Sequence, residues 1–89
     1  MSNSKHKYWK TTDLYLAAFL FGKGAIIVGI QASERKAIFT FIDSLDRQNW
    51  HDEFRSGTPM VDARIYICAL QILRQKRFDA LIEQSNGQN

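Results

Sequence analysis

The sequence predicts a small α+β domain in which a two-stranded antiparallel hairpin packs against three helices, in the order α-β-β-α-α. A helical pattern of apolar residues ends at a glycine within segment 11–24. Two segments rich in β-branched and aromatic residues follow it, separated by a short polar stretch. The length of 89 residues suits one domain. We expect this domain to span 11–84, between a basic N-terminal tail at 1–10 and a frayed C-terminal tail at 85–89.

The first helix is expected to begin at Thr11 or Thr12, because either hydroxyl can cap the free N–H groups of the first turn. Asp13 then places negative charge at the positive end of the helix dipole. Gly22 or Gly24 supplies the left-handed residue that ends the helix. The apolar face of this helix recurs at helical spacing and comprises Leu14, Ala17, Ala18 and Phe21.

Two strands are predicted at Ala25–Gln31 and Ala37–Asp43. The short polar segment between them indicates an antiparallel hairpin with a loop of about four residues. Because side chains alternate along a strand, Phe39 and Phe41 share one face, and we expect them to form the aromatic core beneath the helices.

Two further helices complete the domain. Ser44 is the predicted cap of a helix over 45–56, which ends at Gly57. Asp62 is the predicted cap of the last helix, which extends from 63 to about 83.

Composition argues against several classes of protein. The chain has one cysteine, Cys68, and no apolar segment behind its polar, basic N-terminus, so we expect a cytoplasmic protein without disulfides. Gly22-Lys23-Gly24 interrupts the longest apolar run, which argues against a membrane span. His6 and His51 are far apart and no nucleophile has a base beside it, so we expect no metal, no cofactor, no small-molecule substrate and no catalysis.

Two groups of basic residues are candidates for contact with nucleic acid. The formal net charge of +3 permits an anionic partner without requiring one. The alternative for the tail is structural, since one of its two aromatic residues could pack against the first helix. The candidates are Lys5, Lys7, Tyr8, Trp9 and Lys10 in the tail, and Arg74, Lys76 and Arg77 on the last helix.

The last helix carries two apolar stripes. Tyr66, Leu70 and Leu73 form the stripe expected to face the core. The second stripe consists of Ile65, Cys68 and Ile72 and needs another cover. Either the 45–56 helix or a second copy of the chain could provide that cover, and the second choice makes these three residues a dimer interface.

Several motifs stand in order along the chain: TTDLYLAAFL, Gly24, Phe39-Thr40-Phe41, and VDAR-x-Y-x-x-A-L-x-x-L from Val61 to Leu73. Together they resemble a family of short bacterial and phage proteins that is catalogued as a domain of unknown function. The resemblance implies the same succession of helix, hairpin and helices, but no activity. The isoleucines at 65 and 72 and the basic lead-in to Trp9 depart from the family pattern.

Two functions follow as hypotheses. The first is a non-catalytic interaction module that acts as a homodimeric adaptor or regulator in phage, mobile-element or nucleic-acid-linked machinery. The alternative is direct nucleic-acid binding through the basic aromatic tail and the Arg74–Arg77 cluster. The partners expected are therefore a second copy or another protein, with nucleic acid as the alternative and no membrane.

Overall fold

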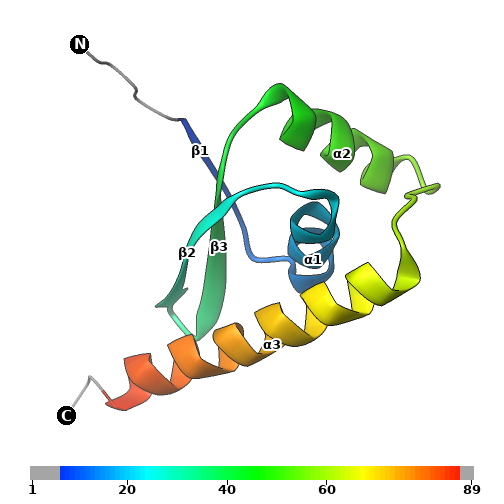
Figure 1. Ribbon diagram of the computed structural model, residues 1–89. Helices are drawn as coiled ribbons and strands as arrows, with labels where there is room; N and C mark the ends of the chain where they lie inside the picture. The colour runs from blue at the N-terminus through cyan, green and yellow to red at the C-terminus, as the bar shows by residue number, and fades with distance from the viewer. Residues whose placement is uncertain (1–6, 87–89) are drawn as a thin grey trace.

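The computed structural model describes residues 7–86 and shows a three-stranded antiparallel sheet with three helices (Figure 1). Helix α1 lies behind the sheet, with α2 on one side of it and α3 on the other. The elements in chain order are β1 (Tyr8–Thr11), α1 (Leu14–Lys23), β2 (Ile27–Ser33), β3 (Lys36–Ile42), α2 (Leu45–Arg55) and α3 (Ala63–Asn86).

The α+β class is confirmed, but the prediction of a two-stranded sheet was wrong. The strand order is β1-β3-β2, because the end of the predicted tail forms a strand that pairs antiparallel with β3. Trp9 lies opposite Phe41 and Thr11 lies opposite Phe39, so both face the helices. A strand of four residues has no periodicity long enough to detect, and its stability comes from its neighbours in the fold.

The hairpin turn is tighter than predicted. β2 and β3 pair as far as Ser33 and Lys36, so only Glu34 and Arg35 connect them. Their φ angles are 52° and 67°, the left-handed conformation that two-residue hairpin turns require at both positions. The turn therefore holds Arg35 and Lys36 at a fixed place at the end of the sheet.

The N-cap of helix α1 lies one residue after Thr12 and two after Thr11, the two predicted caps. Asp13 is the N-cap, and its Oδ1 accepts hydrogen bonds from the backbone N–H groups of Tyr15 and Leu16 at 3.0 and 3.2 Å. Thr11 instead accepts from the N–H of Asp13. Of the two glycines considered for the C-cap, Gly24 takes that place with a φ of 113°.

The core surrounds α1, which is buried on most of its circumference because the sheet, α2 and α3 all contact it. The expectation for Phe39 and Phe41 is confirmed, since neither is exposed to solvent. The largest fully buried side chains are Phe19, Phe39, Phe41, Leu20 and Leu73.

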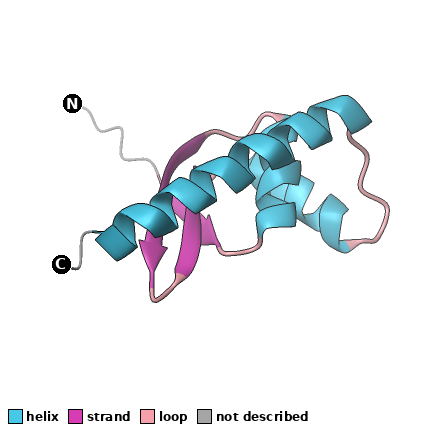
Figure 2. Ribbon diagram, turned by 90° about the horizontal axis from the view of Figure 1, so that it is seen from below, coloured by secondary structure: helices cyan, strands magenta, loops and turns pink. Residues whose placement is uncertain are grey.

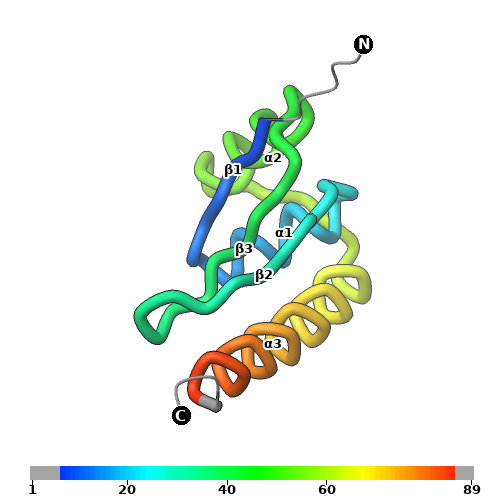
Figure 3. The backbone as a smooth tube through the Cα atoms, turned by 90° about the vertical axis from the view of Figure 1, so that its left-hand side faces the viewer, coloured from blue at the N-terminus to red at the C-terminus, as the bar shows by residue number. Residues whose placement is uncertain are grey.

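The caps predicted for α2 and α3 are confirmed. Ser44 accepts a hydrogen bond from the N–H of Arg47 at 3.0 Å, and Asp62 accepts from Arg64 and Ile65. Helix α3 is longer than expected and continues through Ser85, which the sequence placed in a frayed tail. It lies first along α1 and then along the sheet, as Figure 2 shows, while the other face of the sheet stays open (Figure 3).

Candidate interaction surfaces

The first candidate surface is an apolar stripe on α3, formed by Ile65, Cys68 and Ile72. Half of Ile65 and 44% of Ile72 are exposed, and Cys68 is exposed as well. All three residues of the stripe are therefore open to solvent in a single chain. The stripe borders an open groove of about 300 Å³ whose other side is the end of α1, at Phe21 and Gly22.

Helix α2 does not cover this stripe. It packs against α1, which separates it from α3 (Figure 1). The approach of α1 to α3 is close, because a Cβ at Gly22 would lie 3.3 Å from Cγ2 of Ile65. The sequence left open whether α2 or a second copy covers the stripe, and within residues 7–86 no helix takes that place.

The second candidate surface, called the basic groove below, lies on the other flank of α3. The hairpin turn brings Arg35 and Lys36 to the same recess of about 330 Å³ as Arg74 and Arg77. Its remaining lining residues are Thr12, Ala37, Phe78 and Leu81.

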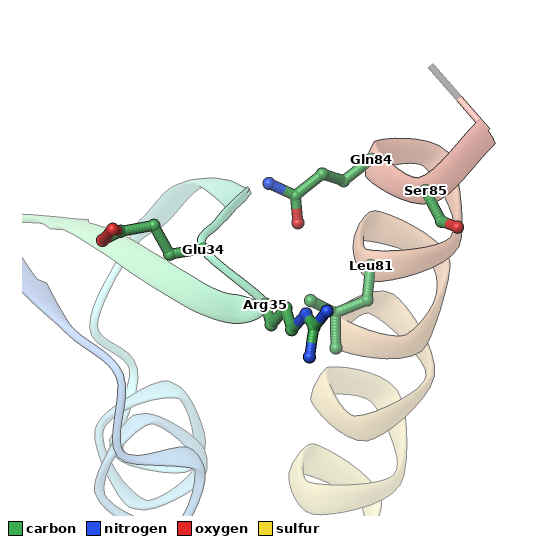
Figure 4. A pocket seen from close by; sticks show the side chains of 5 residues that line it. All are labelled: Glu34, Arg35, Leu81, Gln84 and Ser85. Carbon is green, nitrogen blue, oxygen red and sulfur yellow. The ribbon is translucent and has the colours of Figure 1, made fainter. Parts of the chain in front are cut away.

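The basic groove extends toward the end of α3. A second hollow of about 440 Å³ shares Arg35 and Leu81 with it and adds Glu34, Gln84 and Ser85. In Figure 4, Arg35 reaches from the turn toward Leu81, whereas Glu34 points away from the helix. Glu34 also lines this second hollow, although its carboxylate is turned away from the helix.

The four cations of the basic groove have no ion-pair partner among the described residues. The two ion pairs found in residues 7–86 join Lys23 to Glu53 and Arg47 to Asp43. Phe78, which also lines the groove, is 57% exposed. The groove thus offers unpaired positive charge beside an accessible aromatic ring.

The structure divides the basic cluster predicted on the last helix. Arg74 and Arg77 line the basic groove, but Lys76 lies on the flank that carries the apolar stripe. There it lines a recess of about 390 Å³ between α3 and β2, together with the acidic Asp79 and Glu83. The sequence missed Arg35 and Lys36 because their proximity to α3 depends on how the hairpin docks.

The aromatic tail does not form a single site. Lys5 lies outside the described residues, and Lys7 and Tyr8 are exposed at the end of the sheet opposite the hairpin turn. The seven residues of β3 separate that end from the turn by roughly 20 Å. Lys10 alternates with Trp9 and therefore points to the open face of the sheet.

Trp9 is part of the packing between β1 and α2. Its ring centroid lies 6.3 Å from that of Phe41 and 5.1 Å from that of His51. The guanidinium carbon of Arg47 lies 4.2 Å from the Trp9 ring centroid. One face of the indole is thus occupied by a side chain of the protein itself.

Arg47 is the centre of this cluster and is 95% buried, as its exposed fraction is 5%. Its Nε and Nη2 donate to Oδ1 of Asp43 at 2.9 and 2.8 Å, and these hydrogen bonds lower the pKa of Asp43. Burial, together with the charge of Arg47, lowers the pKa of His51. Because arginine only donates, Nδ1 of His51 accepts from Arg47 at 3.3 Å and must be unprotonated.

A family model described as a domain of unknown function, DUF5659, matches residues 6–79. The chain belongs to this family. The match confirms the predicted resemblance to a domain of unknown function. Searches of the curated proteins and of the solved structures found no significant match.

The DUF5659 region contains most of both candidate surfaces. It includes the whole apolar stripe, the hairpin turn and the cations and phenylalanine of the basic groove. The residues of α3 from Leu81 to Ser85 lie beyond it.

Residues 7–86 contain neither a cluster of three metal-ligating side chains nor a helix that could span a membrane. No three histidine, cysteine or carboxylate side chains in this range stand close enough to share a metal ion. None of the helices described has the length and apolar character needed to cross a bilayer.

Proposed function

We propose that the protein is a non-catalytic interaction module that acts as a homodimer, with the α3 helices of two copies packed against each other. The observation that carries this proposal is the exposed apolar stripe of Ile65, Cys68 and Ile72, which α2 leaves uncovered. Exposed, contiguous apolar side chains on a small domain are typical of interaction sites. Both candidate surfaces border open grooves and not enclosed cavities, which suits contact with another macromolecule.

The spacing of the stripe favours a second copy as the partner. A two-fold interface requires that each residue meet its counterpart in reverse order. Ile65 lies three residues before Cys68 and Ile72 lies four residues after it. In an antiparallel pair of α3 helices centred near Cys68, Ile65 of one copy therefore faces Ile72 of the other, and the two Cys68 side chains face each other.

Charge supports the same arrangement. Asp62 and Lys76 lie about two helical turns from Cys68, in opposite directions. The antiparallel pair brings Asp62 of one copy toward Lys76 of the other, so unlike charges meet at both ends of the stripe. Neither residue belongs to an ion pair described within the single chain.

The wider role that we propose is that of a small adaptor or regulator in nucleic-acid-linked machinery of a phage or mobile element. Support for this role comes from the basic groove, which lies on the other flank of α3 and stays accessible in the proposed dimer. The lone cysteine suits the reducing cytoplasm in which we place the protein.

Sedimentation velocity of the double variant Ile65→Glu/Ile72→Glu tests the proposal. We expect the unmodified chain to sediment as a dimer and this variant as a folded monomer, because two buried charges per copy would oppose association. The matched control is Ile67→Glu/Ile82→Glu, which changes two exposed isoleucines elsewhere around the same helix. This control should stay dimeric.

Two results would reject the proposed dimer. One is a monomeric unmodified chain at the concentrations used for sedimentation. The other is dissociation of the control to the same extent as the stripe variant, since the effect would then not belong to the stripe. Circular dichroism of each variant establishes that it is folded.

A further inference from the structure

We propose that the basic groove between the hairpin turn and α3 binds single-stranded nucleic acid, with phosphates held by Arg35, Lys36, Arg74 and Arg77 and a base stacked on Phe78. These residues lie on the flank of α3 away from the apolar stripe. The inference therefore stands independently of the proposed dimer.

The electrostatic part of the argument rests on four cations that converge from two separate elements. Arg35 lies in the turn and Lys36 at the start of β3, and Arg74 and Arg77 come from consecutive turns of α3. None of the four belongs to an ion pair described in residues 7–86, and Glu34, which lines the adjoining hollow, pairs with none of them. Unpaired cations that line one recess attract a ligand with several negative charges along its length.

The dimensions of the recess suit a polymer. On α3 its lining runs from Arg74 to Ser85, which at 1.5 Å per residue is roughly 17 Å. The two hollows along this length share Arg35 and Leu81, so they form one continuous path. Arg35 lies at the middle of that path and reaches toward Leu81 (Figure 4).

Phe78 indicates which class of anion the groove fits. An acidic peptide would use the cations but would have no need of an exposed aromatic ring. Phe78 is 57% exposed and lines the same recess as the cations. Cations that follow a backbone, with an aromatic ring on which a base can stack, are the features of proteins that bind single strands.

The shape of the site favours one strand over a duplex. Proteins read a duplex by inserting a protruding helix or ribbon into its groove. Here the four cations line a recess between the turn and α3, and the recess receives the ligand. A single strand can lie in such a recess, and we therefore expect it to bind more tightly than a duplex.

Fluorescence anisotropy with a labelled oligothymidine, the full-length chain and a series of salt concentrations tests the proposal. Four phosphate contacts to a single strand predict a salt slope of about −2.8, so affinity should fall about 50-fold between about 50 and 200 mM salt. Arg74→Gln/Arg77→Gln should reduce that slope by about half. The control Arg55→Gln/Arg64→Gln removes the same charge from exposed residues outside the groove and should keep the slope.

Stacking is tested with Phe78→Ala. Loss of one stacked base should weaken binding to oligothymidine about 5- to 150-fold. The control Ile82→Ala removes an exposed apolar side chain from the same helix and should leave affinity unchanged. A labelled duplex should bind more weakly than the single strand at equal salt.

Several outcomes would overturn the inference. They are the absence of binding to oligothymidine at low salt, an equal loss of affinity in the charge-matched control, and an equal or stronger affinity for the duplex. Unchanged binding by Phe78→Ala together with binding of a labelled polyglutamate peptide would also reject it, because the groove would then be a general site for acidic chains.

Discussion

The guanidinium carbon of Arg47 lies over the indole of Trp9, 4.2 Å from the ring centroid. This contact joins α2 to β1, two elements that are far apart in the sequence. Arg47 is buried and is also bonded to Asp43, so the indole packs against a side chain that is itself held in place. The contact adds to the pairing with β3 that holds this strand of four residues.

Trp9→Ala should destabilise the fold by about 3 kcal/mol, because it removes a large side chain that packs on Phe41 and Arg47. Tyr8 offers a matched control on the same strand, since it is 58% exposed and points to the open face of the sheet. Tyr8→Ala should change stability by no more than about 0.5 kcal/mol. Urea denaturation of both variants measures the difference, and equal effects would contradict the packing role of Trp9.

The stability of the protein should fall as the pH drops from about 7.5 to about 5.5. His51 has a pKa below its usual value of 6.5 in the folded chain, chiefly because it is partly buried. The unfolded chain therefore binds more protons below about pH 6.5, and protonation favours unfolding. His51→Gln should flatten the dependence of unfolding free energy on pH over this window. Denaturant titrations at several pH values check this, and an unchanged slope would mean that His51 does not titrate differently on folding.

Phe39→Ala and Phe41→Ala should each cost about 3–5 kcal/mol, since both rings are fully buried between the sheet and α1. For a domain of this size such a loss is a large share of the total stability. Chemical denaturation gives the values. A loss below about 1 kcal/mol for both variants would contradict the register in which these residues face the core.

Local signals in the sequence were enough to place α1, the hairpin strands and the caps of α2 and α3. A capping residue, a glycine stop and the alternation around Phe39 and Phe41 each depend on neighbours a few positions away. β1 escaped detection because its pairing with β3 joins segments thirty residues apart, and its residues looked like a basic tail. The burial of Arg47 was missed because it depends on the contact with Trp9, which is also distant in the sequence. One local signal was available, since Asp43 and His51 each lie four residues from Arg47, a spacing that places side chains on the same side of a helix.

The candidate surfaces were predictable to different degrees. Helical spacing alone identified the stripe of Ile65, Cys68 and Ile72, because all three residues lie on one helix. The basic groove could not be derived in the same way, since it needs the turn at Arg35 to dock beside Arg74. Sequence proximity grouped Lys76 with Arg74, whereas the helix turns these two side chains to different flanks.

Oxidative cross-linking through Cys68 is the most direct test of the proposed dimer, since this is the one cysteine of the chain. In an antiparallel pair centred near Cys68, the two Cα atoms come within the distance of roughly 4.4–6.8 Å that a disulfide spans. A mild oxidant should therefore convert the protein almost completely to a covalent dimer. The yield should stay the same on dilution as long as the protein concentration remains above the dissociation constant of the dimer. The control Cys68→Ser/Gln71→Cys moves the thiol to an exposed position off the stripe and should link poorly. A chain that stays uncross-linked, or one that links no better than this control, would contradict the account.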